Sequence, residues 1–399
     1  MTTTYEPSAE SPKTALYSLA AANFAVGTGG LVIAGIVPDL AIGLDVSAPA
    51  AGQLITVYAL VYALSAPLIS VWTSGLDKKC VLLFGIVGLV LSNLAAMWAP
   101  SYEVVIAARI ASALSAAAIT PVAAAIATMI VPPERTGSAL GLVFGGIAIS
   151  TVLGVPAGAF IGGVFDWRAT FGLVSVLSVA SLMSVLVFVP SRILSARRDF
   201  SSLVSVLKDR PAMAAVSVTA LVMTAQFIPF SYAAVLFANA LSATSAQVFW
   251  LLFAFGAASA VGNYFGGVLS DRLTPNRVLS TVLILLPAAL FGVWFLSLGF
   301  WTALVIMAIW GAIGFSFNAP QQARLTRMRP PQATMLLALN ASAIYVGTML
   351  GSAIGGLALA FSTSSSLPVM GALAAFGALL TFCATLEQGT EPKADFQRC

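Results

Sequence analysis

The chain has 399 residues, of which 59% are hydrophobic and only 8% are charged. A soluble domain carries about 25% charged residues, so this composition excludes an ordinary water-soluble protein and points to lipid as the surrounding medium. The net charge of +4 comes from Lys and Arg in short polar segments, which indicates membrane orientation rather than a nucleic-acid partner.

Apolar runs recur along the whole chain, each long enough to cross roughly 30 Å of hydrocarbon as a helix of about twenty residues. A helix satisfies its own backbone hydrogen bonds, as lipid requires. In chain order the runs predict helices over residues 17–38, 49–71, 79–99, 103–129, 138–163, 169–190, 212–236, 247–269, 278–296, 300–321, 334–360 and 368–386. The predicted fold class is therefore an all-α membrane protein with twelve transmembrane helices.

An even number of crossings places both termini on one side of the membrane. If the N-terminus is inside, all of the 18 lysines and arginines except Arg109 and Arg168 fall in inner segments. The positive-inside rule then predicts that both termini are cytoplasmic. The polar segment up to Lys13 lacks a basic region and a cleavage site, so we expect the first helix to be retained.

The longest hydrophilic stretch follows the sixth predicted helix. It divides the chain into an N-terminal six-helix bundle (residues 1–190), a cytoplasmic linker (191–211) and a C-terminal six-helix bundle with a short tail (212–399). A glycine pattern supports two pseudo-symmetric halves, because its spacing of four, four and one occurs once in each. Its members are Gly154, Gly158, Gly162 and Gly163 in the fifth helix, and Gly347, Gly351, Gly355 and Gly356 in the eleventh.

We interpret the glycine-rich fifth helix as a conformational switch at the interface between the halves. Gly154 and Gly158 flatten one helix face, so that a neighbour can approach closely and slide. Pro156 removes a backbone donor and permits a kink. Ordinary close packing without a gating role is the alternative.

A second predicted switch element is the pair Asp271 and Arg272, in a short inner loop after the eighth helix. There a carboxylate can face a helix N-terminus while the arginine pairs across the loop. The alternative is that these charges only set the topology. The first-half copy around Asp77 lacks the same glycine framing, which does not favour a latch there.

Six further sequence features are informative together. They are Gly154-Val155-Pro156-Ala157-Gly158, Asp166-Trp167-Arg168, Gly266 to Arg272, Arg109, Ala51-Gly52-Gln53, and Ala319-Pro320-Gln321-Gln322. These features resemble the major facilitator superfamily, in its twelve-helix drug:proton antiporter branch, over essentially residues 15 to 387. Within that branch the chain is similar to bacterial purine base/nucleoside efflux pumps, with sugar and chloramphenicol efflux permeases nearby. The resemblance implies a secondary transporter of the bacterial inner (plasma) membrane that exports a small organic solute by alternating access.

The proton-carrying group that the resemblance implies is missing. Relatives commonly have a glutamate in the first helix, and Gly30 stands at that position here. No acidic residue lies deep inside a predicted helix, and histidine is absent. Asp39 and Asp166, near the outer face, remain as proton-coupling candidates, with an interfacial role as the alternative for Asp39. Proton antiport, uncoupled facilitated exchange by the same fold, and a non-transporting membrane sensor therefore stay open.

Arg109 is the most informative substrate-binding candidate because it lies inside the fourth helix. A buried arginine costs at least about 2.5 kcal/mol, so it should face a polar interior and bind an anionic or carbonyl-bearing group. A structural arginine that reaches outward to Glu103 is the alternative. Further candidates, each with a plain helix–helix hydrogen bond or packing contact as its alternative, are Thr28, Tyr58, Gln226, Trp310 and Asn318.

The sequence argues against catalysis and against bound cofactors. Without histidine there is no Ser/His/Asp set, and no phosphate-binding loop of the ATPase type is present. The three cysteines show no metal-binding or disulfide spacing. We expect a small-molecule substrate, protons and the lipid bilayer as partners, no nucleic acid, and a monomeric protein.

Overall fold

The computed structural model describes residues 12–194 and 206–387, and in these ranges it is helical with no strand. Twelve helices in the described part are long and apolar enough to cross a membrane. This confirms the predicted fold class. The tail, and most of the expected linker, lie outside the described residues.

The N-terminal half (the N-half, residues 12–194) contains six of these membrane-spanning segments. They are α1 (Pro12–Leu31) with a 3₁₀ turn η1 (Val32–Gly35), α3 (Ala48–Trp72), α4 (Lys78–Met97), α5 (Tyr102–Met129), α6 (Thr136–Ile149) with a π-helical turn η3 (Ser150–Gly154) and α7 (Val155–Val164), and α8 (Trp167–Phe188).

The C-terminal half (the C-half, residues 206–387) repeats this order. Its segments are α10 (Arg210–Phe230), α12 (Ser245–Arg272), α13 (Pro275–Gly292) with η4 (Val293–Leu298), α14 (Phe300–Phe315) with α15 (Asn318–Met328), α16 (Ala333–Phe361) and α17 (Ser366–Glu387). A short helix follows the first segment of each half, α2 (Val37–Gly43) and α11 (Ala233–Leu241).

Capping side chains explain several helix boundaries. Asp77, Asp166 and Asp209 precede α4, α8 and α10, and each accepts a hydrogen bond from a backbone N–H in the first turn. Thr244 begins α12 in a reciprocal capping box with Gln247. The predicted helices agree with these bounds to within about five residues, with two exceptions. The helix predicted over 212–236 stops at Phe230, directly after Pro229, which cannot donate to the hydrogen-bond ladder. The helix predicted over 300–321 ends at Phe315, and its segment continues as α15 to Met328.

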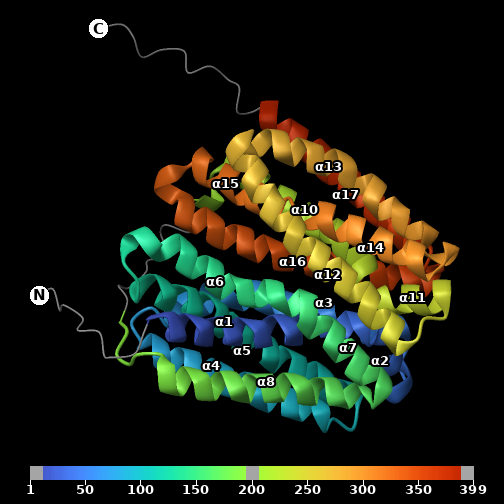
Figure 1. The fold of residues 1–399 in the computed structure, drawn as a ribbon, viewed down its shortest axis with the longest axis horizontal. Coiled ribbons are helices and arrows are strands. Elements are labelled where there is room, and N and C mark those ends of the chain that lie inside the picture. Colours follow the sequence, from blue (N-terminus) through green and yellow to red (C-terminus); the bar gives the residue numbers. More distant parts are fainter. Residues whose placement is uncertain (1–11, 195–205, 388–399) are drawn as a thin grey trace, which may run out of the picture.

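Figure 1 shows the two halves side by side, the N-half in blue to green and the C-half in yellow to red. The start of α1 and the end of α17 lie at the same end of the molecule, which we call the terminal end. The short helices α2 and α11 lie at the opposite end.

The repeated glycines let backbones approach closely within each half. In the N-half, Gly154 and Gly158 meet Thr28 and Val32 of the first segment, because a Cβ on either glycine would collide with those side chains. The matching glycines of α16 meet the backbone and side chains of α10 in the same way. These contacts lie inside each half, whereas the switch interpretation expected Gly154 and Gly158 at the interface between the halves.

Only the fourth glycine of each set faces the other half. Gly163 contacts Ser245 at the start of α12, and Gly356 contacts Gln53 of α3. The fourth glycine of each set directly follows the third, so it lies on another side of the helix and faces the other half. We call the interface between the two halves the seam.

The seam is closed at the opposite end. Along α3 and α16, the Ser352 hydroxyl donates to the Gly52 carbonyl at 3.1 Å, and the rings of Tyr62 and Tyr345 stack at 3.7 Å between centroids. Along η3 and α12, Gly256 lies directly against the Thr151 carbonyl. These contacts run from the opposite end to about the middle of the helices.

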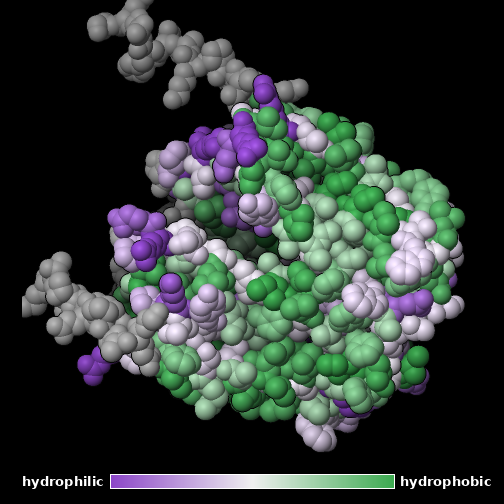
Figure 2. Space-filling view, viewed as in Figure 1, coloured by the Kyte–Doolittle hydropathy of each residue, from purple (hydrophilic) through white to green (hydrophobic). Residues whose placement is uncertain are grey.

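At the terminal end the two halves separate. Figure 2 shows hydrophobic surface over most of the molecule, and hydrophilic residues gathered at the terminal end on either side of a hollow between the halves. On α6, which reaches this end, a Cβ at Gly137, Gly141 or Gly145 would meet nothing within 4 Å. The structure is therefore open toward the end that carries both termini.

We expect Gly256→Ala to destabilise the protein by about 1–3 kcal/mol, because its methyl group would push against backbone across the seam. Gly267→Ala is the matched control on the same helix, since its Cβ would lie 3.5 Å from Ala319, an ordinary contact. The control should be neutral, or stabilising by up to about 1 kcal/mol through helix propensity. Thermal unfolding of both variants in lipid nanodiscs measures this, and equal stabilities would contradict the seam described above.

Candidate functional site

Arg109 is fully buried, with 1% of its surface exposed, in the middle of the N-half. Its two terminal nitrogens donate to the carbonyls of Gly29 and Gly30, at 2.7 and 3.3 Å. Its guanidinium also lies 4.2 Å from the centre of the Tyr58 ring. A planar cation that combines a fork of donors with a stacking face suits both contacts.

The local structure of α1 explains why these carbonyls are available. The α-helix ends at Leu31 and tightens into the 3₁₀ turn η1, so Gly29 and Gly30 belong to its last turn. Carbonyls there lack regular helical partners, and the helix dipole places partial negative charge at this end. Arg109 therefore caps the helix, and the predicted alternative, an outward reach to Glu103, is not what the structure shows.

Three buried polar atoms around Arg109 have no hydrogen-bond partner. They are its own Nε, the Tyr58 hydroxyl and the hydroxyl of Ser112, three residues further along α5. Among the described residues Arg109 forms no ion pair. A Cβ on Gly30 would lie 3.4 Å from the Tyr58 hydroxyl oxygen, so this glycine faces the same group. We call Arg109, Tyr58, Ser112 and Gly30 the N-half cluster.

A row of tyrosines connects the N-half cluster to the other half. Tyr58 stacks on Tyr62 one turn along α3, with 6.5 Å between centroids, and Tyr62 stacks on Tyr345 of α16. The row therefore runs from Arg109 across the seam, at the point where contact between the halves stops. Sequence analysis did not single out Tyr62. Its spacing of four from Tyr58 was the available signal, because residues so spaced share a helix face.

A second cluster lies in the C-half, between α10 and α14. Gln226 donates from Nε2 to the Gly314 carbonyl at 3.1 Å, while its Oε1 has no partner. The indole N–H of Trp310 is also unpaired, and both side chains are 1% exposed. Position 314 adjoins both groups, because a Cβ on Gly314 would touch the Gln226 amide and lie 3.6 Å from the Trp310 ring. We call Gln226, Trp310 and Gly314 the C-half cluster.

Aromatic rings surround the C-half cluster. Trp310 packs edge to face on Phe255 at 4.8 Å and on Phe230 at 6.2 Å between centroids. A buried donor and a buried acceptor without partners cost free energy unless another molecule satisfies them. Apolar walls with a few directional polar groups are typical of small-molecule sites.

Two predicted substrate residues lie apart from both clusters. The Thr28 hydroxyl donates to the Phe24 carbonyl of its own helix at 2.8 Å, and its side chain packs on Gly154. Asn318 is half-buried at the start of α15, where the tenth spanning segment bends after α14.

The two proton-coupling candidates lie near each other at the opposite end. Asp39 is half-buried in the first turn of α2. Burial raises the pKa of the Asp39 carboxyl, a backbone hydrogen bond opposes this in part, and the charge of Asp166 raises it further. Asp166 caps α8, and its Oδ1 lies 3.7 Å from the Arg168 guanidinium. Within the described residues, no hydrogen bond or ion pair joins either residue to the N-half cluster.

The switch loop takes different forms in the two halves. In the second half, Asp271 and Arg272 are the last two residues of α12, where the sequence predicted a loop, and both are exposed without a hydrogen bond or ion pair to described residues. In the first half, Asp77 accepts hydrogen bonds from the backbone N–H groups of Lys79, Arg192 and Ile193, at 3.0, 3.1 and 3.2 Å. These hydrogen bonds at Asp77 therefore occur in the first-half copy of the loop, where the sequence did not favour a latch. They join α4 to the segment after α8.

Pro156 lies in the first turn of α7, directly after the π-helical turn η3. The missing N–H of proline disturbs the regular ladder, and the extra residue of a π turn accommodates this. The predicted irregularity in the fifth helix is therefore a π turn.

Comparison with known proteins adds to this description. A model of the Major Facilitator Superfamily matches residues 19–237 and 215–397. The inner membrane transport protein YdhP of Escherichia coli O157:H7 is 31% identical over 366 residues, covering 92% of this chain and 94% of that protein. The chloramphenicol resistance protein of Streptomyces lividans is 29% identical over 384 residues, covering 92% and 95%.

Two solved structures share the fold. The nucleoside transporter NupG matches with a TM-score of 0.77 at 10% identity, over 94% of this chain and 100% of that one. A bacterial homologue of the human lysosomal transporter Spinster, in an inward-facing and unoccupied conformation, matches with a TM-score of 0.72 at 17% identity, over 93% and 94%.

We expect Asp77→Ala to lower the free energy of unfolding by about 1–2 kcal/mol, because it removes a helix cap together with two bonds to the segment after α8. Asp271→Ala is the matched control in the repeated loop and should leave stability unchanged. Chemical unfolding followed by tryptophan fluorescence compares them, and a similar loss in both would disprove the asymmetry.

We expect Arg109→Lys to destabilise the fold by about 2–3 kcal/mol, since an ammonium cannot hold both carbonyls and lie flat on Tyr58. Arg272→Lys, at the exposed end of α12, should cost less than about 0.5 kcal/mol. If thermal unfolding shows Arg109→Lys to be as stable as Arg272→Lys, the carbonyl fork is not important for the fold.

Proposed function

Because the chain belongs to the Major Facilitator Superfamily, we propose that it exports a small organic solute by alternating access across the bacterial inner membrane. Its family and relatives are membrane transporters and not enzymes, and it is a multi-pass inner membrane protein. We further propose that the terminal end faces the cytoplasm, as the positive-inside rule predicts, and that the protein acts as a monomer of two six-helix bundles.

The observation that carries this proposal is the one-sided seam. Contacts between the halves run from the opposite end to the Tyr62–Tyr345 stack and the Gly256–Thr151 contact, and the halves separate beyond them. Rigid bundles that touch along half of their length can rock about the middle and open the other end. A sensor without transport has no need for this arrangement.

The N-half and C-half clusters are the proposed solute contacts. Both contain buried polar atoms that lack partners, one with a cation and one with an amide and an indole. The Gln226 amide offers both a donor and an acceptor, which suits a nucleobase edge, a sugar hydroxyl or the amide of a drug such as chloramphenicol. The similarity to a chloramphenicol resistance protein supports export of a drug-like molecule.

Proton antiport is the energy source that we propose, with Asp39 and its neighbour Asp166 as the coupling groups. Support comes from the half-buried position of Asp39 and from the rise in its carboxyl pKa on burial. Uncoupled exchange is the second candidate, and one observation favours it: within the described spans Arg109 has no acidic partner. The gating elements would be the glycine contacts, the π turn and the loop at Asp271 and Arg272.

We expect Asp39→Asn to abolish uptake of chloramphenicol or a nucleoside driven by a pH gradient in inverted vesicles, because an amide cannot release a proton. Counterflow, with solute on both sides and no gradient, should continue in the variant at a rate similar to that of the wild type. Asp45→Asn is the control, an acid on the loop after α2.

The vesicle assay also separates the candidate functions. Wild-type accumulation that a protonophore does not reduce would exclude antiport and leave uncoupled exchange. Absence of both accumulation and counterflow for every drug, nucleoside and sugar tested would contradict the transporter assignment of the site.

A further inference from the structure

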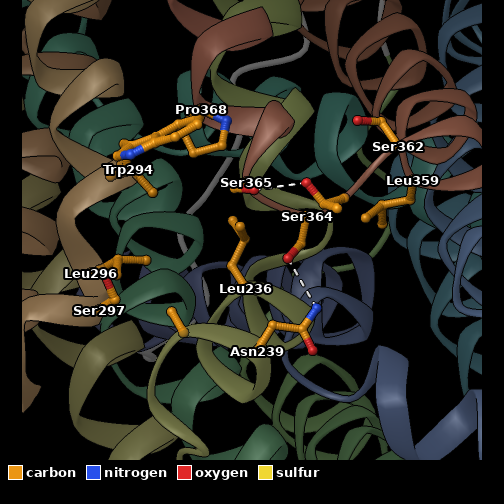
Figure 3. Close-up of a pocket in the computed structure, with 13 residues that line it drawn as sticks. Leu236, Asn239, Trp294, Leu296, Ser297, Leu359, Ser362, Ser364, Ser365 and Pro368 are labelled. Atoms are coloured by element: carbon orange, nitrogen blue, oxygen red, sulfur yellow. Dashed lines mark hydrogen bonds between the residues drawn. The ribbon is translucent and has the colours of Figure 1, made fainter.

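A cavity of about 610 Å³ lies at the opposite end of the C-half, away from both clusters. Its walls come from α11, η4 and the loop that joins α16 to α17 (Figure 3). The volume is within the range of about 300–1,000 Å³ that is typical of small-molecule sites. None of its lining residues is charged.

Hydroxyl and amide groups form one side of this cavity, which we call the hydroxyl pocket. Four consecutive residues, 362–365, supply hydroxyls, and Asn239 of α11 faces them. Asn239 donates to the Ser364 hydroxyl at 2.9 Å, as Figure 3 shows, and the hydroxyls of Thr363 and Ser365 lie 2.8 Å apart. These bonds preorganise the wall. Each hydroxyl can still accept a hydrogen bond, and so can the Asn239 carbonyl.

Apolar groups form the other side of the hydroxyl pocket. Trp294 of η4 is 47% exposed, Figure 3 shows Pro368 beside it, and Leu236 and Leu296 also line the cavity. Figure 3 places Leu236 between Trp294 and Asn239. A broad indole opposite uncharged hydrogen-bonding groups suits a molecule that has one apolar face and several hydroxyls.

The internal repeat gives an independent argument, because the equivalent place in the N-half is filled. There the residue after the cap of α8, Trp167, is 2% exposed, and its indole contacts Gly43 at the end of α2. The next residue, Arg168, donates to the Ala99 carbonyl after α4 at 3.1 Å. These two large side chains therefore join α2, the end of α4 and the start of α8. In the repeat, these elements correspond to α11, η4 and the start of α17, which surround the hydroxyl pocket.

The C-half has no such filling. α17 begins with Ser366, Leu367 and Pro368, where α8 begins with Trp167 and Arg168. None of these three side chains is as large as a tryptophan or as long as an arginine, and the space between α11 and η4 is a cavity with hydroxyls in its lining. The same arrangement of elements is therefore filled by side chains in the N-half and encloses a cavity in the C-half.

We propose that the hydroxyl pocket binds an uncharged glycoside, with its hydroxyls on Asn239 and residues 362–365 and its apolar face on Trp294. The site is separate from the N-half and C-half clusters, and it does not depend on which solute they carry. It lies at the opposite end of the molecule from the terminal end.

The test is thermal unfolding with phenyl-β-D-glucoside as the probe. The full chain is placed in phosphatidylcholine nanodiscs, because maltoside and glucoside detergents carry the same chemistry as the probe. The wild-type melting temperature should rise by about 3 °C when the probe is in roughly tenfold excess over its Kd. Phenyl-β-D-glucuronide, which adds a carboxylate, should produce no rise, since the pocket has no cation to pair with it.

Two substitutions on α11 locate the binding. Ala240→Trp fills the pocket and should abolish the rise, whereas Ala238→Trp, an exposed residue of the same helix outside the lining, should leave it intact. Ser364→Ala removes the partner of Asn239 and should weaken the probe roughly tenfold, and it decides the question if Ala240→Trp does not fold.

The proposal is overturned if the wild type shows no rise, or if the glucuronide acts equally. It is also overturned if the rise persists in Ala240→Trp with unchanged affinity in Ser364→Ala. That last result would place the glycoside elsewhere, and it would leave the proposed transport function intact.

Discussion

Close backbone contact between the first and fifth segments of each half is the constraint on which the rest of the structure depends. Side chains spaced by four on α1 and η1 fit against glycines spaced by four on η3 and α7, and α10 and α16 repeat the contact. In lipid there is no hydrophobic force between helices, so such contacts hold bundles together through dispersion. They bring the backbones of the first and fifth segments close together in each half.

Burial of Arg109 follows from this arrangement and from the end of the α-helix at Leu31. A cation in a low-dielectric interior is tolerable only when dipoles or charges replace its water. Two carbonyls and a tyrosine ring do so here without a carboxylate. The protein thus keeps a permanent positive charge in its core, whose strength does not depend on the protonation of a neighbouring acid among the described residues. Any solute that reaches the tyrosine row meets that field.

The helices and their order were predictable from the sequence, because a twenty-residue apolar run has few alternatives in a membrane. Arg109 and Gln226 were also identifiable, since polar groups at that depth must find partners. What could not be predicted is which neighbour each group selects. The Thr28 side chain packs on Gly154 of its own half. Among the described residues, backbone N–H groups bind Asp77 and not Asp271, and two of the residues that donate them lie more than a hundred positions away in the chain. The contact of Tyr62 with Tyr345 likewise belongs to the assembled halves and to neither helix alone.

The π turn at Ser150–Gly154 has a geometric consequence for the seam. One additional residue in a helix rotates everything beyond it by about 100° relative to a continuous α-helix. With this rotation, Gly146 before the turn and Gly158 after it both lie against the first segment, near Ala20 and Val32 respectively. In the fifth segment, the helical repeat after the π turn is therefore out of register with the repeat before it. If the extra residue of the π turn moved by one position along the helix, the residue that it passed would turn to a different side of the helix. Both ends of the helix would keep their orientation.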